Sequence, residues 1–228
     1  MKNKVIITGA GRGIGLETAK IFDNQNWEVI SIDKYFKKTF YGKKIIFDLN
    51  HLNKIGDLIE SIGPVKTIVN NAATLFCDPI NKVPEKNIEE ILNVNLKAPI
   101  KIINAALKYM KPKKNGRIIN VGSVSAFTGH PDLWYGATKA AIINITKTYS
   151  SQFSKFGILF NAVAPGPTKT DMYNKLPLSR KKSVMQNVYL KRPCKASEVA
   201  KTIFWLGSSS PEYICGSTID VNCGSYPR

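Results

Sequence analysis

Short apolar runs alternate with longer segments of helical periodicity along the whole chain. Runs rich in Val, Ile and Thr read as strands buried on both faces, because such strands carry apolar residues almost without interruption. They predict strands over residues 4–8, 28–33, 43–47, 67–70, 116–121, 159–164 and 218–221. Apolar residues spaced three and four apart predict helices over 13–25, 51–61, 86–110, 134–155 and 196–207. This alternation predicts a single-domain α/β fold of Rossmann type, a doubly wound parallel sheet of about seven strands with helices on both faces.

Length and composition are compatible with one domain over residues 1–228. The 228-residue chain has no Pro/Gly/Ser-rich linker, and a chain of this size buries roughly 70–75% of its unfolded surface. No stretch reaches the roughly 18 apolar residues that a membrane span needs, and the first residues lead straight into a predicted strand. We therefore expect a cytoplasmic protein without a membrane partner.

The cysteines do not indicate a metal site. Cys77, Cys194, Cys215 and Cys223 show no C-x-x-C spacing, and the chain has only two histidines that could pair with them. They read as ordinary thiols in a reducing compartment, and we expect no bound metal.

The net charge is strongly positive, at +17, with 33 Lys and Arg against 16 Asp and Glu. Such a field attracts polyanions. The basic groups fall in predicted turns and loops, without aromatic interleaving or a nucleic-acid-binding motif. We interpret the charge first as a solvated surface. A small-molecule substrate that is acidic or carrier-bound is the second interpretation, and a nucleic-acid partner is the third.

A glycine-rich stretch between the first predicted strand and the first predicted helix is the strongest functional signal. Glycine lets the backbone turn sharply and approach a ligand, and the unpaired N–H groups at the start of a helix attract phosphates. The second predicted strand ends at Asp33, where an acid that binds the ribose of adenosine is expected. The stretch predicts a dinucleotide pyrophosphate site, with a structural glycine turn as the alternative. Its expected contacts are Gly9, Gly11, Arg12, Gly13, Ile14 and Gly15.

The spacing Thr-Gly-x-x-x-Gly-x-Gly in this stretch resembles the signature of the short-chain dehydrogenase/reductase (SDR) family. The resemblance implies an enzyme that uses NAD or NADP to transfer a hydride to or from a CH–OH carbon. Asp33 would accept hydrogen bonds from both ribose hydroxyls and repel a 2′-phosphate, so we expect NAD as the cofactor. Arg12 and Lys34 would attract that phosphate, and NADP stays possible.

Two further stretches resemble the cofactor site of the family. Asp48 and Leu49 stand where an acid holds the adenine amino group, although Asp48 could instead cap the helix that follows. Asn71 and Ala72 belong to an Asn-Asn-Ala-Ala turn that is similar to the family's Asn-Asn-Ala-Gly, with Ala73 in place of glycine. By resemblance, Asn71 stabilises the central sheet and lines the cofactor cleft, and a bare turn is the alternative.

Tyr135 and Lys139 form the candidate catalytic pair. Residues four apart on a helix share a face, and a free tyrosine ionises near pH 10, which is too high for a proton shuttle. A neighbouring ammonium stabilises the phenolate, so we expect Lys139 to bring the pKa of Tyr135 toward the working range. Such a pair is common by itself. It becomes specific only together with the glycine stretch, the Asn-Asn-Ala turn and an upstream serine.

The family pattern adds two residues to this pair. Ser123 follows a predicted strand and is the first serine of a Ser-x-Ser pair, so by resemblance it takes the catalytic role in place of Ser125. Asn95 lies inside a predicted long helix, and the family's asparagine at this place holds a water that links the active-site lysine to solvent. The resemblance implies that Tyr135 moves the proton, Ser123 positions the substrate oxygen, and Lys139 tunes the phenol and binds the nicotinamide ribose.

One stretch of the second half matches the family's Asn-x-x-x-Pro-Gly-x-x-x-Thr pattern. There, Pro165, Gly166, Thr168 and Thr170 would contact the nicotinamide end of the cofactor, with a structural turn as the alternative. Residues 171–195 carry apolar side chains beside basic ones, and we expect them to cover the substrate as a mobile lid.

The C-terminal part resembles the family more loosely. Ser197 is expected to cap the last predicted helix. The closing sequence carries Cys215, Asn222 and Cys223 where Thr, Asp and Gly are usual in the family. Members of the family form dimers or tetramers through two long helices and the last strand, so a homodimer or homotetramer is expected by resemblance only.

These observations predict an NAD(P)(H)-dependent oxidoreductase that interconverts a secondary alcohol and a ketone. It would resemble a 3-oxoacyl-thioester reductase or a dehydrogenase of small hydroxy compounds. Two alternatives come from other functional classes. One is a regulatory protein that binds the dinucleotide without useful catalysis, and the other is a nucleic-acid-binding protein that uses the basic surface.

Overall fold

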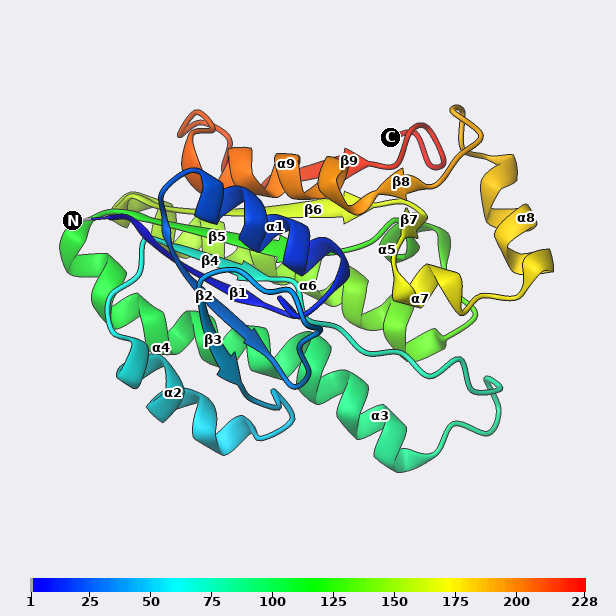
Figure 1. Cartoon of the computed structure of the whole chain (residues 1–228), viewed down its shortest axis with the longest axis horizontal. Helices are drawn as coiled ribbons and strands as arrows, with labels where there is room; N and C mark the ends of the chain where they lie inside the picture. The colour runs from blue at the N-terminus through cyan, green and yellow to red at the C-terminus, as the bar shows by residue number, and fades with distance from the viewer. Residues whose placement is uncertain (1) are drawn as a thin grey trace.

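The computed structural model describes residues 2–228, so Met1 lies outside the described residues. It contains a sheet of seven parallel strands (Figure 1). The order across the sheet reverses between β1 and β4, which is where an open α/β sheet forms its ligand crevice. In sheet order, the strands are β3 (Lys43–Ile46), β2 (Glu28–Asp33), β1 (Lys4–Thr8), β4 (Thr67–Asn70), β5 (Gly116–Val121), β6 (Ile158–Pro165) and β9 (Thr218–Val221).

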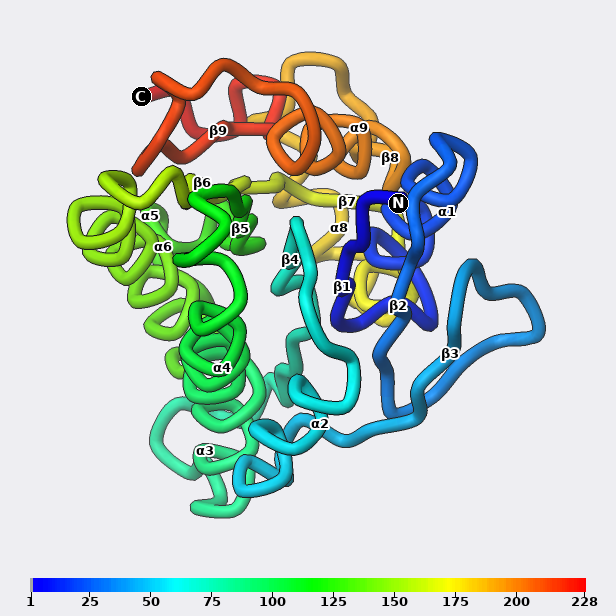
Figure 2. Tube along the Cα trace, turned by 90° about the vertical axis from the view of Figure 1, so that its left-hand side faces the viewer, coloured from blue at the N-terminus to red at the C-terminus, as the bar shows by residue number. Residues whose placement is uncertain are grey.

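Helices cover both faces of the sheet (Figure 2). One face carries α1 (Gly13–Asn24) and α9 (Ala196–Ser208), and the other carries α2 (Ile55–Ile62), α4 (Ala98–Lys113) and α6 (Leu133–Phe153). Successive residues of β1 separate into two apolar cores, because Val5 and Ile7 face one layer of helices and Ile6 faces the other. The doubly wound α/β fold that the sequence predicts is confirmed.

The strand bounds agree closely with the apolar runs. Five of the seven strands have the predicted bounds, β3 ends one residue earlier, and β6 is one residue longer at each end. All eight residues of β6 are buried, which is why a run of apolar residues marks a strand of this kind so clearly.

The long helix predicted over 86–110 is wrong in detail. Its first part is α3 (Glu85–Leu92), which continues through a π-helical turn, η2 (Asn93–Lys97), into α4. The helix predicted over 51–61 also begins differently, with the 3₁₀ turn η1 (Leu52–Lys54) before α2. Apolar spacing finds a helix but does not reveal turns wider or tighter than 3.6 residues.

Residues 170–193 form a separate excursion beyond the carboxyl ends of the strands, which we call the 170–193 segment. Its two ends are joined by a short parallel pair of strands, β7 (Thr168–Lys169) and β8 (Cys194–Lys195). It contains α7 (Asp171–Asn174) and α8 (Leu178–Gln186), which lie beyond one edge of the sheet (Figure 1). The remaining short elements are α5 (Ser125–Thr128) and the 3₁₀ turn η3 (Ser154–Phe156).

The expected cap of α9 is wrong. The N-cap residue is Lys195, and the side chain of Glu198 accepts a hydrogen bond of 2.7 Å from the Lys195 N–H. Ser197 lies inside the first turn of the helix instead. Glu198 takes the capping role because an acid at the third helical position can reach back to the free N–H group.

Two negative findings hold for residues 2–228. No helix there is both long enough and apolar enough to cross a bilayer. No three His, Cys, Asp or Glu side chains gather there in a way that could hold a metal ion.

Candidate active site

The glycine loop between β1 and α1 is packed too tightly for side chains. Gly9 has a φ of +68°, and a Cβ atom there would lie 2.7 Å from Asn71 Nδ2. A Cβ atom on Gly11 would collide with the carbonyl oxygen of Tyr35. Arg12 precedes α1 without a side-chain capping bond, so it leaves the first N–H groups of the helix to an anion. The loop therefore fits the pyrophosphate group of a dinucleotide.

Asn71 ties the ends of β1 and β4 together. Its Nδ2 donates hydrogen bonds to the carbonyl oxygens of Thr8 (3.0 Å) and Gly9 (3.2 Å). The backbone N–H groups of Asn71 and Ala72 each donate to Thr8 Oγ1 at 3.1 Å. Gly15 belongs to the same arrangement, because a Cβ atom there would collide with the Gly9 carbonyl oxygen. Asn71 thus lies against the glycine loop and supports the central sheet at the crevice.

Asp33 lies beside the glycine loop at the end of β2. Its Oδ2 accepts a hydrogen bond of 2.9 Å from the Gly11 N–H, and its Oδ1 accepts one of 3.2 Å from the Tyr35 N–H. The neighbouring Lys34 pairs with Glu90 at 3.3 Å. The carboxylate is therefore held at the loop, while the Lys34 ammonium is engaged by an acid of α3.

Asp48 does not cap a helix. Its Oδ1 accepts a hydrogen bond of 2.9 Å from the Asn50 N–H, which is a local turn, and neither η1 nor α2 has a side-chain cap. Leu49 is buried in one apolar core, and Ile14 packs on the edge of the other. Leu49 therefore anchors the loop after β3 to the sheet, and Ile14 anchors the first turn of α1 to it.

Thr170 lies next to the glycine loop, although it is 157 positions from Gly13 in the sequence. A Cβ atom on Gly13 would lie 3.2 Å from Thr170 Cγ2. Thr168 Oγ1 donates a hydrogen bond of 2.9 Å to the Gly166 carbonyl oxygen. The Pro165 carbonyl oxygen accepts a hydrogen bond of 3.0 Å from the N–H of Val124, which follows β5. The stretch predicted to contact the nicotinamide end thus lies between the glycine loop and the exit of β5.

Ser123, Tyr135 and Lys139 come together at the carboxyl end of β5. The hydroxyl of Ser123 lies close enough to the phenol of Tyr135 to lower its pKa, and it accepts a hydrogen bond of 3.1 Å from the Ser125 N–H. Lys139 Nζ lies 5.6 Å from the centroid of the Tyr135 ring and donates to the Val121 carbonyl oxygen at 2.6 Å. The structure brings together the three side chains that the motif predicted.

Burial dominates the ionisation of this group. It raises the pKa of Tyr135 to about 12, while the nearby hydroxyl of Ser123 lowers that pKa and the charge of Asp132 raises it. Burial also lowers the pKa of Lys139 to about 8. Burial is the largest influence on the pKa of Tyr135 here, and the Lys139 ammonium is bonded to the Val121 carbonyl oxygen. The expectation that Lys139 lowers the pKa of Tyr135 stays a prediction.

Asn95 lies on the π-helical turn and links the loop after β4 to α6. Its Oδ1 accepts a hydrogen bond of 2.8 Å from the Thr74 N–H, and its Nδ2 donates to the Thr74 carbonyl oxygen at 2.9 Å and to Thr138 Oγ1 at 3.2 Å. Thr138 stands between Tyr135 and Lys139 on α6. Turns of this kind often occur at functional sites, and this one turns Asn95 toward the candidate catalytic helix.

Sequence reasoning missed two sets of buried polar residues. Asn70 Nδ2 donates to Asn120 Oδ1 at 2.8 Å, and Asn120 Nδ2 donates to Thr146 Oγ1 at 2.9 Å, which connects β4, β5 and α6. Asp132 is only 5% exposed and accepts a hydrogen bond of 2.9 Å from the Tyr135 N–H. Polar residues inside apolar runs and an acid just before a helix are signals that could have revealed them.

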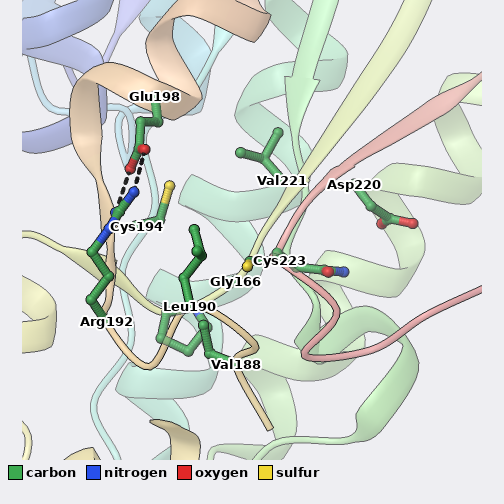
Figure 3. A pocket seen from close by; sticks show the side chains of 11 residues that line it. Gly166, Val188, Leu190, Arg192, Cys194, Glu198, Asp220, Val221 and Cys223 are labelled. Carbon is green, nitrogen blue, oxygen red and sulfur yellow. Dashed lines mark hydrogen bonds and ion pairs between the residues drawn. The ribbon is translucent and has the colours of Figure 1, made fainter.

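A cavity of about 180 Å³ lies at the base of the 170–193 segment (Figure 3). Its wall includes the pair formed by Arg192 and Glu198, at 2.7 Å, and the thiols of Cys194 and Cys223. Gly166 is the only predicted site residue that lines it. The cavity is therefore separate from the group around Tyr135.

Comparison with known proteins decides the family. A family model described as short chain dehydrogenase matches residues 3–181. The chain belongs to the short chain dehydrogenase family. It is 31% identical to the 3-oxoacyl-(acyl-carrier-protein) reductase FabG of Thermotoga maritima, over 96% of each chain. It is 32% identical to the FabG of Rickettsia typhi, over 96% of this chain and 95% of that one.

Solved structures agree with this assignment. The structure of ElxO with NADP bound has a TM-score of 0.89 and 27% identity, and the match covers 99% of each chain. A 4-hydroxyisoleucine dehydrogenase complexed with NADH shares the fold, with a TM-score of 0.91 and 24% identity over 99% of each chain. As a member of this family, the protein is an NAD(P)-dependent oxidoreductase, as the sequence predicted.

Proposed function

We propose that the protein is an NAD(H)-dependent reductase of 3-oxoacyl thioesters, with Ser123, Tyr135, Lys139 and Asn95 as its catalytic residues. The observation that carries the proposal is the convergence of the first three at the carboxyl end of β5. They lie next to the segment that reaches the glycine loop. A ketone oxygen held between the hydroxyls of Ser123 and Tyr135 would have two donors aimed at it.

Each residue of the site has a distinct task in this proposal. A bound nicotinamide supplies or accepts the hydride. Tyr135 gives its phenolic proton to the substrate oxygen during reduction and takes it back during oxidation, and Ser123 donates a hydrogen bond to the same oxygen. Lys139 holds the nicotinamide ribose and supplies positive charge near the phenolate. Asn95 closes a proton relay from Lys139 to solvent.

The proposed substrate class rests on relatives and on the surface. The curated relatives named above are reductases of 3-oxoacyl groups on a carrier. Exposed apolar side chains on α7, α8 and the loop after β4 suit an acyl chain, and they include Met172, Leu178 and Phe76. Arg180 on α8 and the net charge of +17 would attract an anionic carrier.

The preference for NAD(H) rests on Asp33. Its carboxylate lies 2.9 Å from the N–H of Gly11, where it would accept the ribose hydroxyls and repel a 2′-phosphate. Two of the lysines that could bind that phosphate are paired with acids, Lys34 with Glu90 and Lys37 with an acid of α7. The remaining predicted cofactor contacts belong to the same proposal.

Three further expectations stay predictions. Residues 171–195 would act as the substrate lid. The protein would be a homodimer or homotetramer, and it would be located in the cytoplasm.

The test is a panel of 3-oxoacyl thioesters, ketones and secondary alcohols, each assayed with NAD(H) and NADP(H) by nicotinamide absorbance. We expect the highest kcat/KM for a 3-oxoacyl thioester with NADH. Tyr135→Phe should lower kcat about 10²- to 10⁴-fold, because it removes the only proton donor proposed. Ordinary turnover in this variant would refute the assignment.

A matched pair of serine variants sharpens the test. Ser123→Ala should lower kcat about 10²- to 10³-fold through loss of a donor to the substrate oxygen. Ser125→Ala, two residues further along the same loop, should leave kcat within about twofold. Equal losses in the two variants would contradict the role given to Ser123.

A further inference from the structure

We propose that Asp132 is a positioning residue for Tyr135, because its buried carboxylate joins the start of α6 to the loop that follows β4. The inference rests on the proposed catalytic role of Tyr135. The motif described above does not include this residue. It goes beyond the proposed function by naming a residue that acts through another one.

The geometry of Asp132 uses both carboxylate oxygens. Oδ1 accepts a hydrogen bond of 2.9 Å from the Tyr135 N–H and so caps α6. Oδ2 accepts hydrogen bonds of 3.0 Å from the Phe76 N–H and of 3.3 Å from the Cys77 N–H. The backbone N–H of Asp132 donates to His130 Nδ1 at 3.1 Å, which orients the residue itself. One side chain therefore connects two segments that are 55 residues apart.

A helix cap alone does not require this residue. Ser, Thr or Asn would cap α6 about as well as Asp, and a buried carboxylate is costly unless it is paired or well hydrogen-bonded. Asp132 is 5% exposed and takes part in none of the ion pairs found in residues 2–228. Its charge is offset by three N–H donors and by the N-terminus of a 21-residue helix. Oδ2, which accepts from the loop after β4, gives Asp132 a contact that a residue capping the helix alone does not need.

The loop held by Asp132 is also held by the site. Thr74 exchanges two hydrogen bonds with Asn95, and Phe76 and Cys77 are bound by Asp132. The loop of residues 74–77 is thus hydrogen-bonded at both ends to buried polar side chains. A shift of Asp132 would move the start of α6, and Tyr135 with it, relative to the wall of the substrate site.

The negative charge of Asp132 also acts on the phenol of Tyr135. This charge raises the pKa of Tyr135. Ser123 at the exit of β5 lowers the pKa of the phenol, the His130 ring lies 4.9 Å from the Tyr135 ring, and Lys139 Nζ lies 5.6 Å from it. The other charged or titratable groups near this cluster are Cys77 and Asp78, on the loop after β4, and Arg180, on α8.

The test is Asp132→Asn in the full-length protein, assayed with the best substrate of the panel. The asparagine oxygen can still cap α6, but its NH₂ group cannot accept from the N–H groups of Phe76 and Cys77. We expect kcat to fall about 10- to 100-fold, as for a small misplacement of a catalytic group. KM for the cofactor should change less than about twofold, because Asp132 is remote from the glycine loop. The pKa of the Tyr135 phenol should fall, since a negative charge next to it is removed. The difference between the ultraviolet titrations of Asp132→Asn and the double variant Asp132→Asn/Tyr135→Phe measures this pKa.

A merely structural role would lower stability without changing the pKa of this phenol. Retention of both kcat and the pKa of the phenol would overturn the inference. If Tyr135→Phe is inactive while Asp132→Asn behaves as the native protein, only the inference fails. If Tyr135→Phe stays active, the proposed function fails.

A second measurement needs no variant and applies even if Asp132→Asn does not fold. Amide hydrogen exchange of the native protein should show the Phe76 and Cys77 N–H groups protected to a similar degree as the Tyr135 N–H. Exchange of the loop amides at the rate of an open loop would overturn the inference, because the clamp would then not persist in solution.

Discussion

Charged side chains are buried at the carboxyl ends of the strands, here called the carboxyl edge, and exposed or half-buried at the amino ends, here called the amino edge. At the carboxyl edge, Asp132 and Lys139 are at most 5% exposed, and each is bonded to the backbone of another segment. At the amino edge, a cavity of about 340 Å³ is lined by Lys66, Lys113, Lys114 and Arg117, among other residues. Lys113 and Lys114 lie at the end of α4, and Arg117 bonds the end of α9; the carbonyl ends of helices favour positive charge.

The difference separates residues that serve chemistry from residues that serve stability. A buried charge at the carboxyl edge costs folding free energy unless it is paired or hydrogen-bonded. An exposed or half-buried cation at a helix C-terminus stabilises the fold and needs no other explanation. We therefore expect variants at the two edges to affect different measurements.

The largest effect is expected for Lys139→Met at the carboxyl edge. Removal of the ammonium should lower kcat about 10²- to 10⁴-fold. The melting temperature should fall much less than this loss suggests, because a desolvated charge is removed along with its hydrogen bond. Lys147→Met, at an exposed position of the same helix, is the matched control and should change neither quantity. If the melting temperature of Lys139→Met falls as strongly as its kcat, the statement that the carboxyl edge serves chemistry and the amino edge serves stability is wrong.

The same residue predicts a pH dependence of stability. The pKa of Lys139 is lowered by burial from 10.5 to about 8. Between these values the unfolded chain binds more protons than the folded one, so the contribution of this group to the free energy of unfolding rises with pH. Denaturant unfolding of the native protein from pH 8 to 10 should therefore lose less stability than that of Lys139→Met. Identical pH slopes would contradict the burial of a charged amine.

The next effect is expected at the amino edge. Arg117 donates to the carbonyl oxygens of Leu206 (3.0 Å) and Ser210 (2.9 Å) and to Ser210 Oγ (2.7 Å), at the end of α9. Arg117→Met should lower the free energy of unfolding by about 2 kcal/mol, since hydrogen bonds to a charged group are lost. Its kcat and KM should stay within about twofold of the native values. A change of kcat by more than tenfold would contradict the assignment of Arg117 to stability.

The smallest effect concerns an exposed ion pair near the carboxyl edge. Asp171 at the start of α7 pairs with Lys37 at 2.8 Å, and Arg12 also lowers its pKa. Asp171→Asn should free both cations for the 2′-phosphate and lower KM for NADP(H) by up to about fivefold, as for an exposed pair of 0.2–1 kcal/mol. KM for NAD(H) should not change. Glu60→Gln, which breaks the exposed pair with Lys108, is the control; an equal effect there would remove any special role of Asp171.

The fold was predictable because its strands are buried on both faces. The runs that became β1, β2 and β4 each carry buried Val and Ile residues, so their bounds could be read directly. The π-helical turn at Asn93–Lys97 was not predictable, because apolar spacing does not reveal it and its Asn95 bonds residues distant in sequence. The helix α8 was missed since most of its residues are polar or charged.

The site was predictable only where a local pattern carries it. Tyr135 and Lys139 are four residues apart, and the motif names both. The clamp of Asp132 on Phe76 and the pair between Lys37 and Asp171 join residues that are 56 and 134 positions apart. No spacing along the chain reveals such partners, because they are set by the way the loops meet at the edge of the sheet.

The pairing of β7 with β8 has a consequence for engineering. Thr168 pairs with Cys194 and Lys169 with Lys195, so both stems of the excursion between them are anchored side by side on the scaffold. A replacement stretch of different length and sequence would start and finish at fixed points. Grafting between these stems is thus the natural route to a changed substrate range, provided that Thr170, which lies against the glycine loop, is kept.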